Sequence, residues 1–261
     1  MSEAGVFSEY ARYYDLLYKD KDYAGEADYV HGLIQRFRPG ARTVLELGSG
    51  TGKHAALLAE RGYEVHGIER SAEMLASAEE LVAERKRLNP EQPAPAFSLG
   101  DIRTVRIGRR FDAVISLFHV VSYQITNEDI LAALRTAREH LHADGVFVFD
   151  AWYGPAVLTE RPAVRVKRMS DAHIEVTRLA EPRLLFNDDV VEVNYHVFIR
   201  NTRTGEVRET RETHLMRYVF EPEVRLLAAA TGFRVDHAEE WLHGRQPALD
   251  AWGVCFVLHA M

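Results

Sequence analysis

Cysteine is almost absent from this chain. Cys255 is the single one in 261 residues, so no intrachain disulfide can form. It lies in the apolar run 254–258, which is typical of a buried strand rather than of a nucleophile. Long apolar runs are absent too, and without about 18 consecutive apolar residues no membrane-spanning helix is expected. The first residues lack the positive-then-apolar pattern of a secretory signal, so we expect a cytoplasmic protein.

Positive charge is also scarce. The 32 lysines and arginines are outnumbered by 39 acidic residues, which gives a net charge of −7. This balance argues against binding to nucleic acid or to an anionic membrane. The 12 histidines are scattered without the spacing of a ligand cluster, so no metal site is expected. The length fits one large α/β domain with room for an insert.

A glycine-rich loop is the most informative segment. Apolar residues 44–47 predict a buried strand, glycines follow at positions 48, 50 and 52, and a helical pattern begins at Lys53. Alternate glycines let the chain turn sharply and let a ligand touch the main chain. The spacing matches neither a dinucleotide fingerprint nor a P-loop. Glu46, just before the loop, would repel a phosphate and attract a cation, which favours a nucleoside with a positive end.

The pattern Glu-x-Gly-x-Gly-x-Gly at 46–52 resembles motif I of the class I S-adenosylmethionine (SAM) dependent methyltransferases. SAM carries an ammonium and a sulfonium but no phosphate, which agrees with the charge of the loop. The resemblance implies that the cofactor contacts include Glu46, Gly48, Ser49, Gly50 and Gly52.

The order of predicted elements supports an α/β fold. Strands alternate with helices up to residue 150, which predicts a doubly wound, mostly parallel sheet of seven strands with the Rossmann-like methyltransferase topology. We expect a helical lid over 1–38 and a SAM-binding core over 39–154 and 219–261. We expect residues 155–218 to form an antiparallel β insert, because polar and apolar positions alternate from about residue 163 to 218. This insert would cap the acceptor or form a homodimer surface.

Other strand ends carry candidate cofactor contacts. Glu69 ends the second strand about 20 residues after the glycine loop, where a carboxylate can accept bonds from ribose hydroxyls, and Arg70 follows it. The resemblance places Asp101 at the adenine amino group and Ile102 against the ring. Leu117, at the end of the fourth strand, is a further predicted cofactor contact.

The segment 116–123 follows the fourth strand. In the family it passes beneath the methionine part of SAM and faces the acceptor, which makes His119 a candidate catalytic residue. Lys53 and His54 come directly after the glycine loop. For both we expect a solvated helix face rather than a chemical role.

The N-terminal segment also carries a resemblance. Residues 13–18 read Tyr-Tyr-Asp-Leu-Leu-Tyr and resemble the opening of the amino-sugar N,N-dimethyltransferases of macrolide biosynthesis, which act on nucleotide-linked sugars. The resemblance implies that Tyr14 and Tyr123 are both catalytic and substrate-binding. It further implies that Trp152 binds substrate, since residues 150–153 resemble the family's Glu-Pro-Trp-Trp. Residues 244–253 depart from the family's ending, and Arg245 there is a candidate substrate contact.

The predicted function is therefore transfer of a methyl group from SAM to a small molecule, at an amine nitrogen, with S-adenosylhomocysteine (SAH) as product. The protein must place the nucleophile in line with the methyl group and keep an amine acceptor neutral. The alternatives are an O-methyltransferase on a small metabolite, an RNA methyltransferase and a non-catalytic SAM-binding protein.

Overall fold

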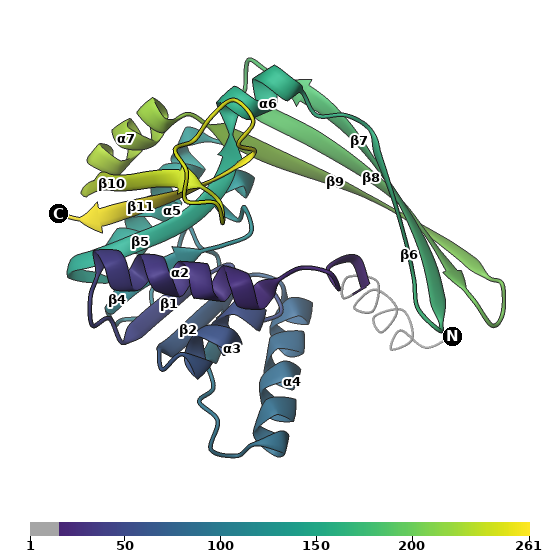
Figure 1. Ribbon diagram of the computed structural model, residues 1–261, viewed down its shortest axis with the longest axis horizontal. Coiled ribbons are helices and arrows are strands. Elements are labelled where there is room, and N and C mark those ends of the chain that lie inside the picture. Colours follow the sequence, from purple (N-terminus) through teal and green to yellow (C-terminus); the bar gives the residue numbers. More distant parts are fainter. Residues whose placement is uncertain (1–15) are drawn as a thin grey trace. The chain divides into compact units, whose positions relative to one another are not determined.

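The computed structural model describes residues 16–261 (Figure 1). The described chain divides into two compact units. The smaller contains residues 16–22 and 161–216, and the larger contains residues 23–160 and 217–261. No helix in residues 16–261 is long and apolar enough to cross a membrane.

The larger unit alternates strands and helices, as the sequence predicts. Ser71 caps α4, because its hydroxyl accepts a hydrogen bond from the Met74 amide at 3.3 Å, and Thr126 caps α5 in the same way. In chain order the elements are α2 (Tyr23–Phe37), β1 (Thr43–Leu47), α3 (Lys53–Glu60), β2 (Glu64–Glu69), α4 (Ala72–Leu88), β3 (Ala96–Leu99), β4 (Phe111–Ser116), the short 3₁₀ helix η1 (Val121–Tyr123), α5 (Asn127–Glu139), β5 (Leu141–Tyr153), α6 (Gly154–Glu160), α7 (Glu221–Ala230), β10 (Phe233–Glu240) and β11 (Gly253–Ala260).

The sheet of the larger unit has the strand order β3-β2-β1-β4-β5-β11-β10. Its first five strands are parallel, and β11 runs antiparallel to β5 and to β10. This confirms the predicted mostly parallel central sheet. The last two residues of β9, Tyr218 and Val219, also pair with the end of β5.

Helices cover both faces of this sheet. Leu45 and Leu47 of β1 point to the face where apolar residues of α5 and α7 pack. Val44 points to the opposite face, against α2 and α3. The alternation follows from the two-residue period of a strand, and it places Glu46 on the α2–α3 face with Val44. Cys255 is fully buried in the same layer, as its apolar surroundings predict.

The smaller unit is an antiparallel sheet. Its strands follow one another in the order β6-β7-β8-β9, and Gly205 closes the turn between the last two with a φ of 72°. The strands span Arg165–Ser170 (β6), Ile174–Leu185 (β7), Val190–Asn201 (β8) and Val207–Val219 (β9). This agrees with the alternating pattern of the sequence, while the roles of lid and acceptor cap remain predictions.

Candidate functional site

Four acidic residues stand at the carboxyl edge of the parallel strands, one at each of four strand ends. Because the strand order is β3-β2-β1-β4-β5, Asp101, Glu69 and Glu46 follow one another along this edge, with His119 and Asp150 after them. In sequence the order is different. In an open α/β sheet, ligands bind at this edge, so the arrangement offers one extended ligand a series of polar contacts.

The glycine loop is fixed to the end of β2. The amides of Gly48 and Ser49 both donate to the Ile68 carbonyl oxygen, at 2.8 and 2.9 Å. Gly48 has a φ of 83°, and a Cβ built on it would lie 2.6 Å from Cγ1 of Val120, so the loop after β4 leaves no room for a side chain. A Cβ on Gly50 would meet nothing within 4 Å, so at that position the loop faces open space.

Glu69 holds this loop in place. Its Oε2 accepts the Gly50 amide at 2.8 Å and its Oε1 accepts the Ser71 amide at 2.8 Å, so one carboxylate joins the glycine loop to the start of α4. Each carboxylate oxygen retains a second lone pair. Glu69 can therefore anchor the loop and still accept bonds from a ligand, although its ribose role remains a prediction.

Glu46 is 1% exposed, in register between Gly67 of β2 and Ile115 of β4. Burial and, to a lesser extent, the neighbouring Glu69 carboxylate raise the pKa of Glu46 to about 8, while a hydrogen bond from the Ala55 amide acts in the opposite direction. Within the described chain, Oε2 of Glu46 and Oγ of Ser49 are buried without a hydrogen-bond partner. Two buried polar atoms without partners, beside the open space at Gly50, indicate a site for a polar ligand.

The expectation of a solvated face for His54 is wrong. Its side chain is 6% exposed, and its Nε2 lies 2.6 Å from Oε2 of Glu26 on α2. The helical pattern of α3 did not reveal this because the burying element, α2, comes earlier in the chain. Glu26 carried a usable signal: it stands four residues before Val30 on an otherwise apolar helix face.

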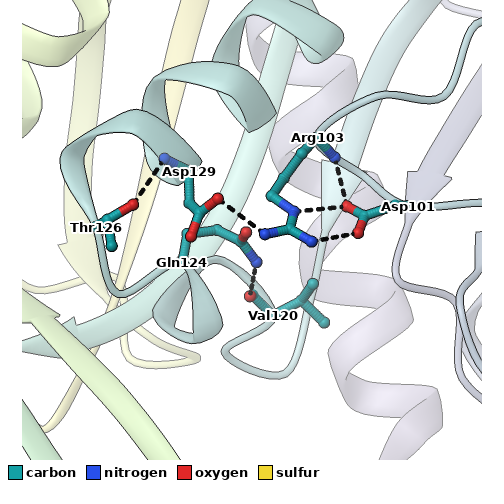
Figure 2. Close-up of polar contacts among 6 residues, drawn as sticks. All are labelled: Asp101, Arg103, Val120, Gln124, Thr126 and Asp129. Carbon is teal, nitrogen blue, oxygen red and sulfur yellow. Dashed lines mark hydrogen bonds and ion pairs between the residues drawn. The ribbon is translucent and has the colours of Figure 1, made fainter.

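Asp101 forms a network with two other charged residues (Figure 2). The Arg103 guanidinium donates to both of its carboxylate oxygens, at 2.9 and 2.6 Å, and also donates to Asp129 at 2.8 Å. The hydrogen bonds from Arg103 lower the pKa of Asp101. The carboxylate is therefore ionised and held in one orientation, which suits an acceptor for an amino group.

The other predicted cofactor contacts differ in exposure. Ile102 is buried in the core layer that also contains Val121, and Leu117 is buried in the opposite layer. Arg70 is exposed, and its charge contributes to lowering the pKa of Asp101. Their contact with a cofactor remains a prediction.

His119 stands beside Asp150, a residue that the sequence reasoning did not select. Nδ1 of His119 lies 2.7 Å from Oδ2 of Asp150, in a close contact that is not aligned as a hydrogen bond, and the His119 amide donates to the same carboxylate at 3.1 Å. Asp150 is 1% exposed. The sequence carried a signal for Asp150, because this acidic residue follows the apolar residues 146–149 just as Glu69 ends the second strand.

The backbone at His119 is strained. Phe118 and His119 have φ values of 66° and 61°, a conformation that costs a non-glycine residue about 1–2 kcal/mol. Consecutive residues in this conformation are typical of functional sites that the surrounding structure holds in place. The ring of His119 packs edge-on against Trp152, with centroids 6.1 Å apart, so two of the predicted acceptor residues lie together.

The remaining acceptor candidates vary in placement. Tyr123 lies in η1 and is 47% exposed, while Tyr14 lies outside the described residues. Arg245, in the loop between β10 and β11, is paired with Glu240 and with Asp250. In residues 16–261, no three His, Cys, Asp or Glu side chains form a group that could hold a metal ion.

Comparisons with known proteins agree with this geometry. A family described as a methyltransferase domain matches residues 44–145. The dTDP-3-amino-3,4,6-trideoxy-α-D-glucopyranose N,N-dimethyltransferase of Streptomyces venezuelae is 30% identical over 241 residues, which are 91% of this chain and 95% of that relative.

Two solved structures are similar over nearly the whole chain. DesVI of Streptomyces venezuelae has a TM-score of 0.77 at 28% identity and covers 97% of this chain and 98% of its own. SAM-bound CalS10, an amino pentose methyltransferase from Micromonospora echinaspora involved in calicheamicin biosynthesis, has a TM-score of 0.74 at 27% identity, with coverages of 97% and 96%.

The residues at the strand ends fit SAM. The unpartnered oxygen of buried Glu46 suits a cation, and open space at Gly50 lets a ligand approach the main chain. The orientation of Asp101 suits the amino group of an adenine. The chain belongs to the class I SAM-dependent methyltransferases, with SAM as its cofactor, and among them it is similar to the amino-sugar N,N-dimethyltransferases.

Proposed function

We propose that this protein methylates the amine nitrogen of a nucleotide-linked amino sugar, such as a dTDP-linked 3-amino deoxy sugar. Two relatives named for dTDP-linked amino sugars, and a structural neighbour described as a sugar N-methyltransferase, support the proposal. The observation that carries it is the His119–Asp150 pair at the neighbouring ends of β4 and β5. The pair lies next to the glycine loop, because Val120, the residue after His119, packs against Gly48.

When bound, SAM supplies a methyl group on a positively charged sulfur, which is a good leaving group. An amine can accept the methyl group only through its free electron pair, so an ammonium must first lose a proton. His119 is placed to take this proton, because one ring nitrogen faces Asp150 and the other is left for the acceptor. Buried Asp150 stabilises the imidazolium that results, as a carboxylate does for a catalytic histidine in other enzymes.

SAM bound at this site would supply the methyl carbon to the electron pair of the amine, and its sulfur would leave as the neutral thioether of SAH. His119 would pass the proton taken from the acceptor ammonium to solvent. The methylated nitrogen is again a cation, and it would lose its own proton by the same route before a second transfer. Trp152, packed against His119, would exclude water from the reacting atoms.

The test is an assay with SAM and dTDP-3-amino-3,4,6-trideoxyglucose, in which SAH and methylated sugar are measured by mass spectrometry. We expect mono- and dimethylated product. The matched sugar with a hydroxyl in place of the amine should give none, and product from it would indicate O-methylation. Binding of SAM without acceptor-dependent SAH would reject the proposed reaction in favour of a non-catalytic role.

We also propose that the antiparallel insert forms a surface covered by a second copy of the chain. Several of its apolar side chains are exposed, among them Val166 and Phe186. Sedimentation equilibrium of the wild type and of Phe186→Ser tests this. A monomer in both cases would leave only a role as acceptor cap.

A further inference from the structure

Three ionisable side chains form a buried cluster next to the glycine loop. Glu46 comes from β1, His54 from α3 and Glu26 from α2, and they are 1%, 6% and 7% exposed. His54 lies between the two carboxylates: its Nε2 is 2.6 Å from Glu26, and its Nδ1 is 3.9 Å from Oε1 of Glu46. The sequence alone did not indicate that these three residues form a group.

Such a cluster is costly in a protein core, since buried charges must be paired and hydrogen-bonded. The short contact with Glu26 fixes which ring nitrogen of His54 carries the first proton, namely Nε2. It also fixes the plane of the ring, so that Nδ1 is directed at Glu46. The contact at 3.9 Å is longer than a hydrogen bond, and a small shift of either side chain would close it.

Other charged and titratable groups face this cluster. The Glu69 carboxylate acts on Glu46 from β2. The ring of Tyr23 lies 5.1 Å from that of His54, and the Lys53 ammonium lies 5.0 Å from the Tyr23 ring centroid. The imidazole is therefore enclosed between α2 and α3, and its Nδ1 is directed at Glu46, whose Oε2 is buried without a hydrogen-bond partner among residues 16–261.

The strand order decides which part of the cofactor reaches Glu46. Along the sheet edge Asp101 and Glu69 come first, and these are the proposed adenine and ribose contacts. Glu46 comes next, on β1, before His119 on the acceptor side. In SAM the amino-acid portion follows the ribose, and the positive group at its end is an ammonium. The Glu46 carboxylate is thus the partner for this ammonium.

We propose that Glu26 and His54 are positioning residues for the amino-acid end of the cofactor, acting through Glu46. Glu26 orients the imidazole, and a proton shared between its Nδ1 and Oε1 of Glu46 holds the Glu46 carboxyl group with Oε2 toward the ammonium. The proposal rests on the proposed function, because it needs the cofactor at this edge of the sheet.

The test compares two ligands by calorimetry. SAH carries the ammonium-bearing tail, whereas 5′-methylthioadenosine keeps the adenosine and sulfur and lacks the tail. We expect His54→Gln and Glu26→Gln each to weaken SAH binding about tenfold, the effect of one charge-assisted hydrogen bond, and to leave 5′-methylthioadenosine within about twofold. The double variant should be no weaker than the worse single one, because the two residues act in series.

Two further variants serve as the positive and the negative control for the loss of SAH affinity. Glu46→Gln should weaken SAH selectively. His31→Gln removes a different histidine, on α2, whose ring is hydrogen-bonded to the Tyr63 hydroxyl at 2.9 Å, and it should change the affinity for neither ligand. Equal weakening of both ligands by His54→Gln would overturn the proposal and indicate a role in the shape of the loop. Selective weakening by Glu46→Gln alone would overturn it while leaving the proposed function intact.

A measurement on the wild type covers the case in which a variant fails to fold. In protein labelled with ¹⁵N-histidine, the ring signals of His54 should shift when SAH is added and stay in place with 5′-methylthioadenosine. Shifts of equal size with both ligands would overturn the proposal. A wild type that binds neither ligand would reject the cofactor site itself, and with it the proposed function.

Discussion

A substitution at Gly48 is the most direct test of this site, because two separate free-energy costs oppose any side chain at that position. Its φ of 83° costs an L-residue about 1–2 kcal/mol. A Cβ would also lie 2.6 and 2.8 Å from the two methyl carbons of Val120, which is β-branched and cannot rotate both away. Overpacking of this kind adds about 1–3 kcal/mol, so Gly48→Ala should lower the free energy of unfolding by about 2–5 kcal/mol.

Gly62 provides the matched control. It has a similar φ of 90°, and a Cβ on it would meet nothing within 4 Å. Gly62→Ala should therefore cost only the backbone part, about 1–2 kcal/mol. The two backbones have a similar φ, so the difference between the two variants reports mainly the contact with Val120.

Removing the opposing methyl groups should rescue Gly48→Ala. The double variant Gly48→Ala/Val120→Ala should regain about 1–3 kcal/mol in a double-mutant cycle, while Val120→Ala should do nothing for Gly62→Ala. Urea unfolding followed by circular dichroism gives the free energies, compared where the m-values agree. Methyl transfer should follow the same order, because Val120 adjoins His119. Equal costs for Gly48→Ala and Gly62→Ala, or the lack of rescue, would refute the reasoning.

Three further predictions concern the carboxylates. Burial raises the pKa of Glu46 to about 8, so between its ordinary value and about 8 the folded state holds a proton that the unfolded chain lacks. Unfolding free energy should thus fall with rising pH by up to about 1.4 kcal/mol per unit, and Glu46→Gln should remove this slope in urea titrations. SAM affinity, measured by calorimetry, should rise across the same window, since the cation favours the ionised carboxylate. Glu69→Ala should weaken SAM binding by about 1.5–3 kcal/mol and also lower stability, because the Gly50 and Ser71 amides lose their acceptor; unchanged affinity would reject the ribose assignment. Asp150→Asn should lower kcat at least about tenfold at neutral pH and leave SAM affinity within about twofold, and an unchanged kcat would remove His119 from the proton path.

Much of the fold was readable because its signals are local. The glycines at 48, 50 and 52 and the apolar strands each indicate their conformation within a few residues, and the structure confirms them. The charge of Glu46 and the glycine spacing oppose phosphate, and the resemblance of the same stretch to motif I of the class I methyltransferases gave the cofactor.

The errors and omissions in the site share one cause. His54 was assigned to a solvated face because its own helix gives no sign of α2, which comes from earlier in the chain and buries it. Asp150 and His119 are 31 residues apart and meet only because β4 and β5 are neighbours. Contacts of this kind depend on which strands pair, and that choice is made by the packing of the whole sheet.

The sequence by itself determined the α/β class and the elements, because backbone conformation is set by neighbouring residues, and it indicated the methyl donor through the resemblance of the glycine loop to motif I. Only the tertiary structure decided the order in which the functional side chains stand. Along the chain Glu46 precedes Glu69 and Asp101, whereas along the sheet edge the order is Asp101, Glu69, Glu46, His119 and Asp150. The physical reason is the crossover from β3 to β4, which returns the chain to the other side of β1 and brings residues from positions 46 to 150 into one row along the sheet edge.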